Sequence, residues 1–179
     1  VCSLQLYETV DGNAGKLPED HRGLLRTLCP YRFEEANTVL QWVAETLLET
    51  SDPREIPQVG FLQAELAEEE EGTPDDVGKI DLVLVHPDMD LLRWCAVEFQ
   101  AVYFSGTEMK VEYDLARDYT AFGVPFPAKS HRPDYRSSGP KRLMPQLQIK
   151  VPTLRRWRKK MAVVVDEAFS RRATLELAA

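Results

Sequence analysis

One strand-like segment, WCAVEFQAVYFSG at residues 94–106, is apolar along almost its whole length. A strand that faces water on one side alternates apolar and polar side chains, whereas a strand covered on both faces is apolar throughout. Similar segments are QVGFLQAEL at residues 58–66, KIDLVLV at residues 79–85 and MAVVVDEAF at residues 161–169. The pattern therefore predicts strands that lie between two layers of helices.

Three segments have the spacing of helices. Segments 107–122 and 153–160 each begin at a threonine that can act as N-cap. The order is helix, three strands, helix, a basic loop and a strand, which predicts the α/β class with a mixed central sheet flanked by helices. In the first helix, at residues 29–50, the apolar positions three and four apart are Phe33, Ala36, Leu40, Val43 and Leu47.

The chain has 179 residues and shows no linker, repeat or low-complexity tract, so we expect a single domain over residues 1–179. It begins at Val1 rather than Met, which indicates a fragment of a longer chain. No apolar run approaches the length that crosses a membrane. Three cysteines are too few for a disulfide framework and favour a reducing cytoplasm.

The net charge of −7 hides a strong asymmetry along the chain. Residues 129–160 contain eleven lysines and arginines and one acid, Asp134, so this segment carries a net charge of +10 and the remaining residues carry −17. Phosphate binding depends on the local field rather than on the total charge. Residues 125–160 are therefore a candidate DNA-contacting segment, and the alternative is a solvated basic surface.

Two polar residues interrupt the apolar strand, Glu98 and Gln100, and their spacing of two puts both on one face. Asp81 lies in the preceding strand between Ile80 and Leu82, which face away from it. A buried carboxylate without a partner is costly, and a divalent metal is one explanation, since Mg²⁺ binds one or two carboxylates plus waters and phosphate. The alternative is that each carboxylate caps a backbone group or pairs with an arginine.

An aspartate on one strand followed by Glu-x-Gln in the next resembles the core motif of the PD-(D/E)xK nucleases. Four longer phrases are more specific: GKIDLVLV, WCAVEFQAVYFSG, RPDYRSSGPKRLMPQLQIK and RWRKKMAVVVDEAF. Together they resemble the NotI-type restriction endonuclease family over most of the chain. The resemblance implies a restriction-endonuclease-like core and a type II-like, Mg²⁺-dependent, site-specific endonuclease that hydrolyses phosphodiester bonds of double-stranded DNA.

The resemblance also implies roles for the site residues. Asp81 and Glu98 would bind the metal, with the backbone carbonyl of Phe99 as a further ligand. Gln100 takes the place of the usual lysine, and its amide can orient the attacking water without supplying positive charge. Glu65 matches a further catalytic glutamate on the preceding strand. Mg²⁺ would lower the pKa of the attacking water and neutralise charge on the phosphate and the leaving oxygen.

The basic segment supplies the expected DNA contacts, because such side chains bind phosphates and base edges. The candidates are Arg132, Arg136, Ser137, Ser138, Lys141, Arg142, Gln146 and Lys150. A homodimer is expected if the DNA target is palindromic. One alternative is an inactive DNA-binding relative of the same fold, which Gln100 keeps open. The other is an interaction module whose basic segment binds an acidic protein.

The cysteines suggest a second metal site by resemblance only. NotI-like proteins carry a structural four-cysteine metal site near the N-terminus, and VCSL and LCPYRF match parts of it. Cys2 and Cys29 are thus candidate ligands of a structural iron or zinc ion, although such sites normally have four ligands. Cys95, in the core strand, is interpreted as a small buried hydrophobe.

Overall fold

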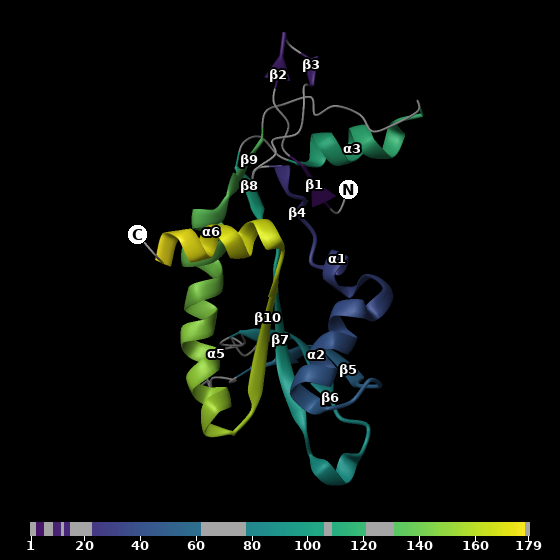
Figure 1. Cartoon of the computed structure of the whole chain (residues 1–179), viewed down its shortest axis with the longest axis vertical. Coiled ribbons are helices and arrows are strands. Elements are labelled where there is room, and N and C mark those ends of the chain that lie inside the picture. Colours follow the sequence, from purple (N-terminus) through teal and green to yellow (C-terminus); the bar gives the residue numbers. More distant parts are fainter. Residues whose placement is uncertain are drawn as a thin grey trace, which may run out of the picture. The chain divides into compact units, whose positions relative to one another are not determined.

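The computed structural model describes residues 3–5, 9–11, 13–14, 23–61, 78–105, 109–120 and 131–177. It divides into two compact units (Figure 1). The central-sheet unit comprises Phe33–Gln100 and Leu143–Val164, and the small-sheet unit comprises Val1–Arg32, Ala101–Arg142 and Val165–Ala179. No helix in the described part of the chain is long and apolar enough to cross a membrane.

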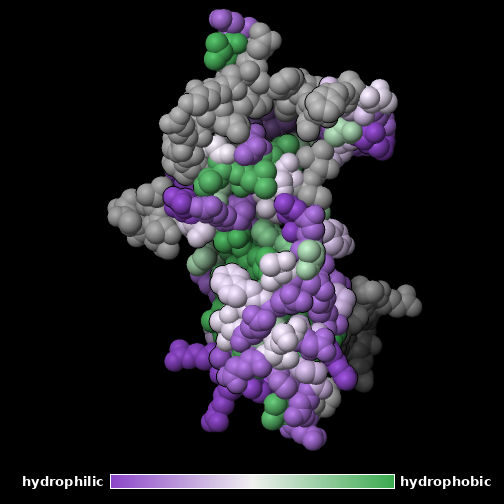
Figure 2. Space-filling model, turned by 45° about the vertical axis from the view of Figure 1, so that its right-hand side comes forward, coloured by the Kyte–Doolittle hydropathy of each residue, from purple (hydrophilic) through white to green (hydrophobic). Residues whose placement is uncertain are grey.

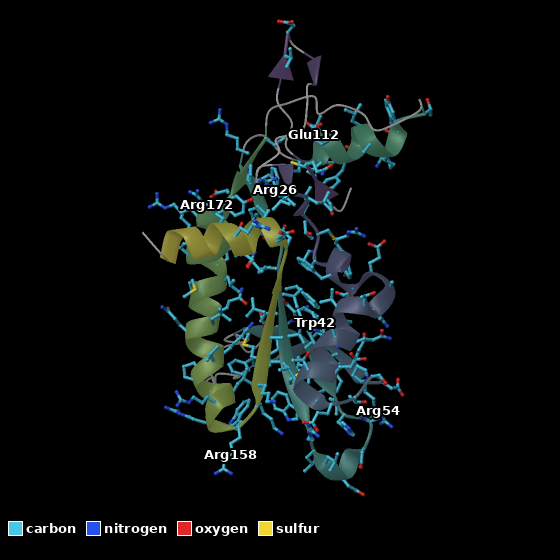
Figure 3. The ribbon with its side chains drawn as sticks, viewed as in Figure 1. Arg26, Trp42, Arg54, Glu112, Arg158 and Arg172 are labelled. Atoms are coloured by element: carbon cyan, nitrogen blue, oxygen red, sulfur yellow. The ribbon has the colours of Figure 1, made fainter. Side chains whose placement is uncertain are left out.

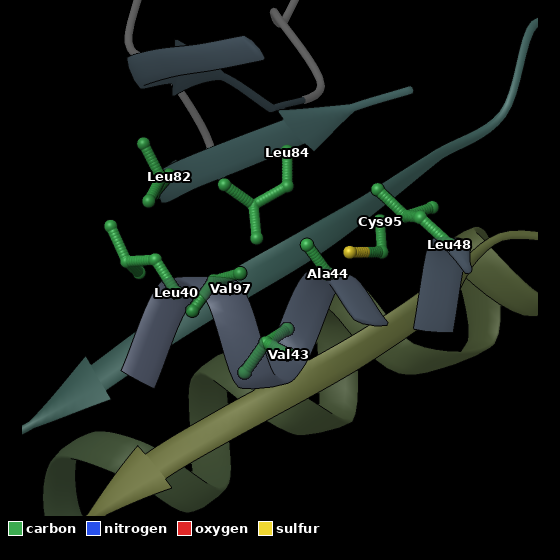
Figure 4. Packing of buried hydrophobic residues seen from close by; sticks show 8 residues of the cluster. All are labelled: Leu40, Val43, Ala44, Leu48, Leu82, Leu84, Cys95 and Val97. Atoms are coloured by element: carbon green, nitrogen blue, oxygen red, sulfur yellow. The ribbon is translucent and has the colours of Figure 1, made fainter. Parts of the chain in front are cut away.

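A four-stranded sheet forms the centre of the first unit, in the order β10-β7-β6-β5. Its strands are β5 (Arg54–Gly60), β6 (Lys79–Val85), β7 (Trp94–Gln100) and β10 (Lys160–Val165), and a 3-10 turn, η3 (Met89–Leu91), lies between β6 and β7. Strand β6 pairs antiparallel with both β5 and β7, whereas β10 points in the same direction as β7 in Figure 4. The sheet is therefore mixed, and the α/β class is confirmed.

Helices cover both faces of β6 and β7. On one face, α2 (Thr38–Leu48) packs on the sheet through the cluster in Figure 4, which consists of Leu40, Val43, Ala44, Leu48, Leu82, Leu84, Cys95 and Val97. On the other face, Leu154 of α5 (Met144–Arg156) packs with Val83 and Ala96. This double cover explains the apolar sequence of both strands. The lower part of Figure 2, where this unit lies, shows a mostly hydrophilic surface.

The first predicted helix is broken rather than continuous. A short helix, α1 (Tyr31–Glu34), and a 3-10 turn, η2 (Glu35–Asn37), precede α2. Ala36 and Asn37 have φ angles of 56° and 55°, in the left-handed region, so the helical path is interrupted there. Asparagine adopts this region more readily than most residues, which favours the break at this point.

The segment predicted as a basic loop is largely helical. It contains β9 (Arg132–Asp134), α4 (Tyr135–Ser138), a π-helical turn, η4 (Gly139–Leu143), and the start of α5. The helix predicted at residues 153–160 therefore begins earlier, at Met144, and ends at Arg156, and Lys160 belongs to β10. Two prolines hid α5 from sequence reasoning. Pro145 lies in the first turn, where proline is tolerated, and Pro152 lies inside the helix, where proline is normally unfavourable.

Short strand pairs and three further helices make up the described part of the small-sheet unit. Asp166 begins the last helix, because its Oδ1 accepts a hydrogen bond from the Phe169 N–H at 2.7 Å. The strand expected to reach Phe169 therefore ends at Val165. The pairs are β1 (Ser3–Leu4) with β4 (Arg26–Thr27), β2 (Thr9–Val10) with β3 (Asn13–Ala14) and β8 (Tyr103–Ser105) with β9, and the helices are α3 (Lys110–Asp118), α4 and α6 (Glu167–Leu177).

Candidate active site

Asp81 and Glu98 lie on adjacent antiparallel strands, just beyond the last pair of the shared ladder. The register of β6 and β7 ends with Leu82 opposite Val97. One further step along this register sets Asp81 opposite Glu98, and opposite residues of an antiparallel pair project from the same face. That face is the one of Ala96, which α5 covers.

Asp81 is half-buried and tied to the backbone of β7. Its Oδ2 accepts a hydrogen bond from the Phe99 N–H at 2.9 Å, and the Glu98 carboxylate accepts one from the backbone of Asp81. Beyond the last backbone pair of β6 and β7, these hydrogen bonds between side chain and backbone connect the two strands. The Phe99 ring points to the opposite face and stacks on Phe33, with 6.0 Å between the ring centroids.

Glu98 is buried and paired with a lysine. Both side chains are 3% exposed, and Oε1 of Glu98 accepts a hydrogen bond from Nζ of Lys150 at 2.6 Å. Nζ also donates to the carbonyl of Lys79 at 2.5 Å and to Oε1 of Gln146 at 3.0 Å. The ammonium therefore uses all three of its donors. Asp81 caps a backbone group and Glu98 pairs with a cation, as the alternative interpretation predicted, with lysine in place of arginine.

Burial and two nearby charges set the ionisation of Glu98. Burial raises the pKa of the Glu98 carboxyl most strongly, and the hydrogen bond and charge of Lys150 oppose that rise. The charge of Asp81 raises the pKa of Glu98 further. A carboxylate in this environment is costly to ionise without a cation beside it. Lys150 favours the charged form of Glu98 most strongly, and the hydrogen bond from the backbone of Asp81 favours it as well.

The remaining predicted active-site residues are only partly within the described structure. Gln100 ends β7, is 8% exposed and lies two residues from Glu98 along the same strand. Its alternation puts it on the same face as Glu98. Glu65 lies outside the described residues, so its role stays a prediction.

Asp81 and Glu98 offer the hard oxygen ligands that a divalent cation prefers. Within the described residues, no group of three or more His, Cys, Asp and Glu side chains is arranged to hold a metal. Mg²⁺ needs fewer protein ligands than that, because it keeps several waters and binds substrate phosphate. Glu98 also accepts a hydrogen bond from Lys150, but a carboxylate has about four lone-pair sites, so this bond does not use up its capacity to bind a metal. The pair therefore fits Mg²⁺.

Basic side chains gather around Asp134 in the small-sheet unit. Oδ1 of Asp134 accepts a hydrogen bond from the Ser137 N–H at 2.9 Å, and Oδ2 accepts one from the Ser137 hydroxyl at 2.7 Å. These bonds hold the pKa of the Asp134 carboxyl below its usual range, and the charges of Lys141 and Arg136 lower it further. Arg136, Lys141 and Arg132 are all exposed. Arg136 and Lys141 thus lie near the Asp134 carboxylate, and Arg132 is two residues from it in the chain. All three cations are accessible to a binding partner.

Arg142 is held against an aromatic ring. Its guanidinium carbon lies 3.7 Å from the centroid of the Tyr103 ring, and Nη1 donates a hydrogen bond to the Tyr103 hydroxyl at 2.5 Å. Both side chains are exposed. The ring restricts the rotamers of the arginine, so its other donors point in a defined direction. Sequence reasoning did not find Tyr103, because its partner is thirty-nine residues away in the chain.

Besides Ser137 and Arg142, three further predicted DNA contacts have partners within the protein: Ser138, Gln146 and Lys150. Ser138 is 0% exposed, and its hydroxyl donates to the carbonyl of Asp134 and accepts from the Tyr103 N–H, both at 2.8 Å. Lys150 is 2% exposed, and Oε1 of exposed Gln146 accepts a hydrogen bond from its ammonium. The burial of Ser138 and Lys150 does not suit a direct contact with DNA. We therefore do not expect either residue at the DNA surface, whereas a DNA contact by exposed Gln146 stays a prediction.

A family model described as restriction endonuclease NotI matches residues 1–177, nearly the whole chain. The chain belongs to the NotI restriction endonuclease family. The resemblance inferred from the four sequence phrases is thereby confirmed. No curated protein and no solved structure matches the chain. Membership of the NotI family supports a nuclease, and hence a hydrolase, with DNA as its partner.

The cysteine site expected from the NotI family is only partly within the described residues. Cys29 is half-buried and free, whereas Cys2 lies outside those residues. The structural iron or zinc site therefore stays a prediction. Cys95 is buried in the core as expected, and burial raises the pKa of its thiol to about 11, which keeps the thiol protonated and unreactive.

Sequence reasoning missed the link between Lys150 and Glu98. Gln146 and Lys150 are four residues apart and so share one face of a helix. That spacing is the available signal, but it has meaning only if the helix is known to begin before Gln146. Because the helix was predicted to start at Thr153, Gln146 and Lys150 were placed in a loop and their spacing carried no information.

Proposed function

We propose that this member of the NotI family is a type II-like restriction endonuclease that cuts double-stranded DNA at a specific sequence with Mg²⁺. The observation that carries the proposal is the position of Asp81 and Glu98, which share one face at the end of the β6–β7 ladder in a chain of this family. We propose in addition that the central-sheet unit is a restriction-endonuclease-like core of the PD-(D/E)xK type.

Asp81 and Glu98 would hold the metal in this proposal. When bound there, Mg²⁺ would lower the pKa of the attacking water and neutralise charge on the phosphate. A backbone N–H of β7 fixes the carboxylate of Asp81, and Lys150 fixes that of Glu98. Gln100 orients the attacking water, because an amide both donates and accepts hydrogen bonds. The proposed set is completed by the backbone carbonyl of Phe99 and the side chain of Glu65.

The proposed contacts with DNA come from exposed basic side chains of the small-sheet unit and from half-buried Ser137. Arginine and lysine bind phosphates and fix the register of a protein on the duplex, and arginine also reads guanine in the major groove. Because two-fold protein symmetry matches a palindromic duplex, the proposal includes a homodimer. The contact residues are Arg132, Arg136, Ser137, Lys141 and Arg142.

A DNA-binding protein of the same fold that does not cut is the second candidate. Position 100 carries an amide where the motif usually has a lysine, so the strand supplies no positive charge there. Glu98 already has a cation at 2.6 Å, which reduces its availability to a metal. Both observations favour a chain that keeps its DNA contacts and has lost the chemistry.

Cleavage of mixed-sequence duplex DNA, in Mg²⁺ and in chelator, separates the two candidates. We expect discrete fragments in Mg²⁺ only. Asp81→Asn and Glu98→Gln should each slow cutting by at least about 100-fold, since a metal ion contributes several kcal/mol to the transition state. The matched control is Glu45→Gln on the exposed face of α2, whose rate should equal that of the wild type.

Two results would count against this assignment. Cutting by Asp81→Asn at the wild-type rate would overturn the active site. Salt-sensitive binding of DNA by the wild type, with no cutting at any Mg²⁺ concentration, would establish the second candidate.

A further inference from the structure

Among the described residues, Lys150 is the only buried lysine. Lysine is almost never fully buried unless its ammonium is paired, so its position requires a specific partner. Its stem is enclosed as well, since a Cβ placed on Gly78 would lie 3.7 Å from Cε of Lys150. The Lys150 side chain therefore lies in a narrow buried space, called the slot below, and not in a groove on the surface.

The slot ends in three oxygens that come from three different elements. They are Oε1 of Glu98 on β7, the carbonyl of Lys79 on β6 and Oε1 of Gln146 on α5. An ammonium bound by three acceptors can reach a DNA phosphate only by giving up all three. Lys150 is thus a fixed part of the sheet corner that also holds Asp81, which lies two residues after Lys79.

The residue at position 100, Gln100, explains why the positive charge of Lys150 is important for the two carboxylates. The strand carries an amide there, and an amide supplies no positive charge to the neighbouring carboxylates. Asp81 and Glu98 repel each other at close range. A cation at 2.6 Å from Glu98 offsets that repulsion from a buried position that salt screens only weakly.

We propose that Lys150 is a positioning residue of the active site, which fixes one oxygen of the Glu98 carboxylate and supplies from α5 the positive charge that Gln100 lacks. The inference rests on the proposed function, because it gives Lys150 a role toward a metal ligand. Carboxylates that bind metals are themselves held by hydrogen bonds, and loss of such a partner costs about 10- to 100-fold in metal affinity or activity.

Two lysine variants test this inference without DNA cleavage. Binding of Mn²⁺ to the DNA-free protein is measured by calorimetry, and DNA affinity is measured in chelator. Lys150→Met should bind Mn²⁺ about 10- to 100-fold more weakly than the wild type and bind DNA equally well. Lys141→Met, an exposed lysine of the proposed DNA surface, should bind Mn²⁺ normally and DNA more weakly.

A milder variant covers the case in which Lys150→Met does not fold. Gln146→Ala removes one acceptor of the slot and leaves the pair of Lys150 and Glu98 intact, so it should weaken Mn²⁺ binding in the same direction by a smaller factor. Unchanged Mn²⁺ affinity in the folded variants, tighter binding, or a loss of DNA affinity in Lys150→Met would overturn the role of Lys150 alone. Absence of Mn²⁺ binding by the wild type would overturn the proposed function, and the inference with it.

Discussion

The two units of this molecule use positive charge in opposite ways. In the central-sheet unit, Lys150 is 2% exposed and its charge is matched by Glu98 at 2.6 Å. In the small-sheet unit, Arg136 and Lys141 are exposed around Asp134. A buried charge interacts strongly and must be matched, whereas an exposed charge is screened by water and salt and remains available to a partner. Burial therefore decides the role of a basic residue, even within one basic segment.

The strongest way to break this comparison is to leave the buried charge unmatched. Glu98→Ala leaves the ammonium of Lys150 buried without its carboxylate, and breaking a buried pair costs about 3–5 kcal/mol of stability. Urea unfolding in chelator measures the change. The control Glu45→Ala removes an exposed carboxylate and should stay within about 0.5 kcal/mol of the wild type. Equal stability of Glu98→Ala and wild type would contradict a buried pair.

The small-sheet unit has a buried polar group of its own, and it should also act on stability. Ser138→Ala removes a hydroxyl that serves both the carbonyl of Asp134 and the N–H of Tyr103, so it should cost about 1–3 kcal/mol. DNA affinity of the folded variant should be unchanged. Thermal unfolding and a binding titration measure the two quantities, with Ser51→Ala as the exposed control. If Ser138→Ala bound DNA more weakly and kept the stability of the wild type, Ser138 would be a DNA contact after all.

Exposed charge should show the reverse behaviour. Arg142→Ala should change stability by less than about 1 kcal/mol, because a cation–π contact at an exposed site is worth no more than that. It should reduce the slope of log affinity for DNA against log salt by about 1, the loss of one phosphate contact. Arg54→Ala on β5, whose side chain points into solvent in Figure 3, is the matched control. An unchanged slope would remove Arg142 from the DNA surface.

The smallest expected difference between the two units is in pH dependence. Burial raises the pKa of Glu98, so the folded protein holds that proton more tightly than the unfolded chain does. Its contribution to stability therefore falls as the pH rises from the usual carboxyl range to the raised pKa. Hydrogen bonds from Ser137 lower the pKa of Asp134. Its contribution is complete above the usual range and is lost as the pH falls through the lowered pKa.

Stability measured against pH checks these opposite signs. Glu98→Gln should reduce the loss of stability that occurs as the pH rises above the usual carboxyl range. Asp134→Asn should reduce the loss of stability that occurs as the pH falls below that range. Both variants keep the size of the side chain, so each serves as the control for the other. A change of the same sign in both would contradict the comparison.

The shared face of Glu98 and Gln100 could be predicted, because alternation along a strand depends only on neighbouring residues. The position of Asp81 opposite Glu98 could not, because it follows from the register of β6 and β7. The apolar runs likewise predicted a sheet covered on both faces. The paired state of the two carboxylates was foreseen as an alternative, but the identity of the cation was not. The local sequence pattern thus predicts the strands and the face of the strand that carries the polar residues.

The role of Lys150 could not be predicted, because it depends on contacts between residues far apart in the chain. Glu98 and Lys150 are separated by fifty-two residues, and they meet only when α5 packs on the sheet. Pro145 and Pro152 concealed that helix, since proline in sequence argues against a helix interior. The burial of Ser138 has the same origin, because Tyr103 reaches it only through folding of the unit.

A crystal structure with bound Mn²⁺ is the most direct test of the central claim that Asp81 and Glu98 form one metal site. Mn²⁺ replaces Mg²⁺ at oxygen ligands and is located by its anomalous scattering. We predict one peak in contact with oxygens of both carboxylates, with Lys150 still bonded to Glu98. A peak elsewhere in the molecule, or no peak at an Mn²⁺ concentration that supports cleavage, would contradict the claim.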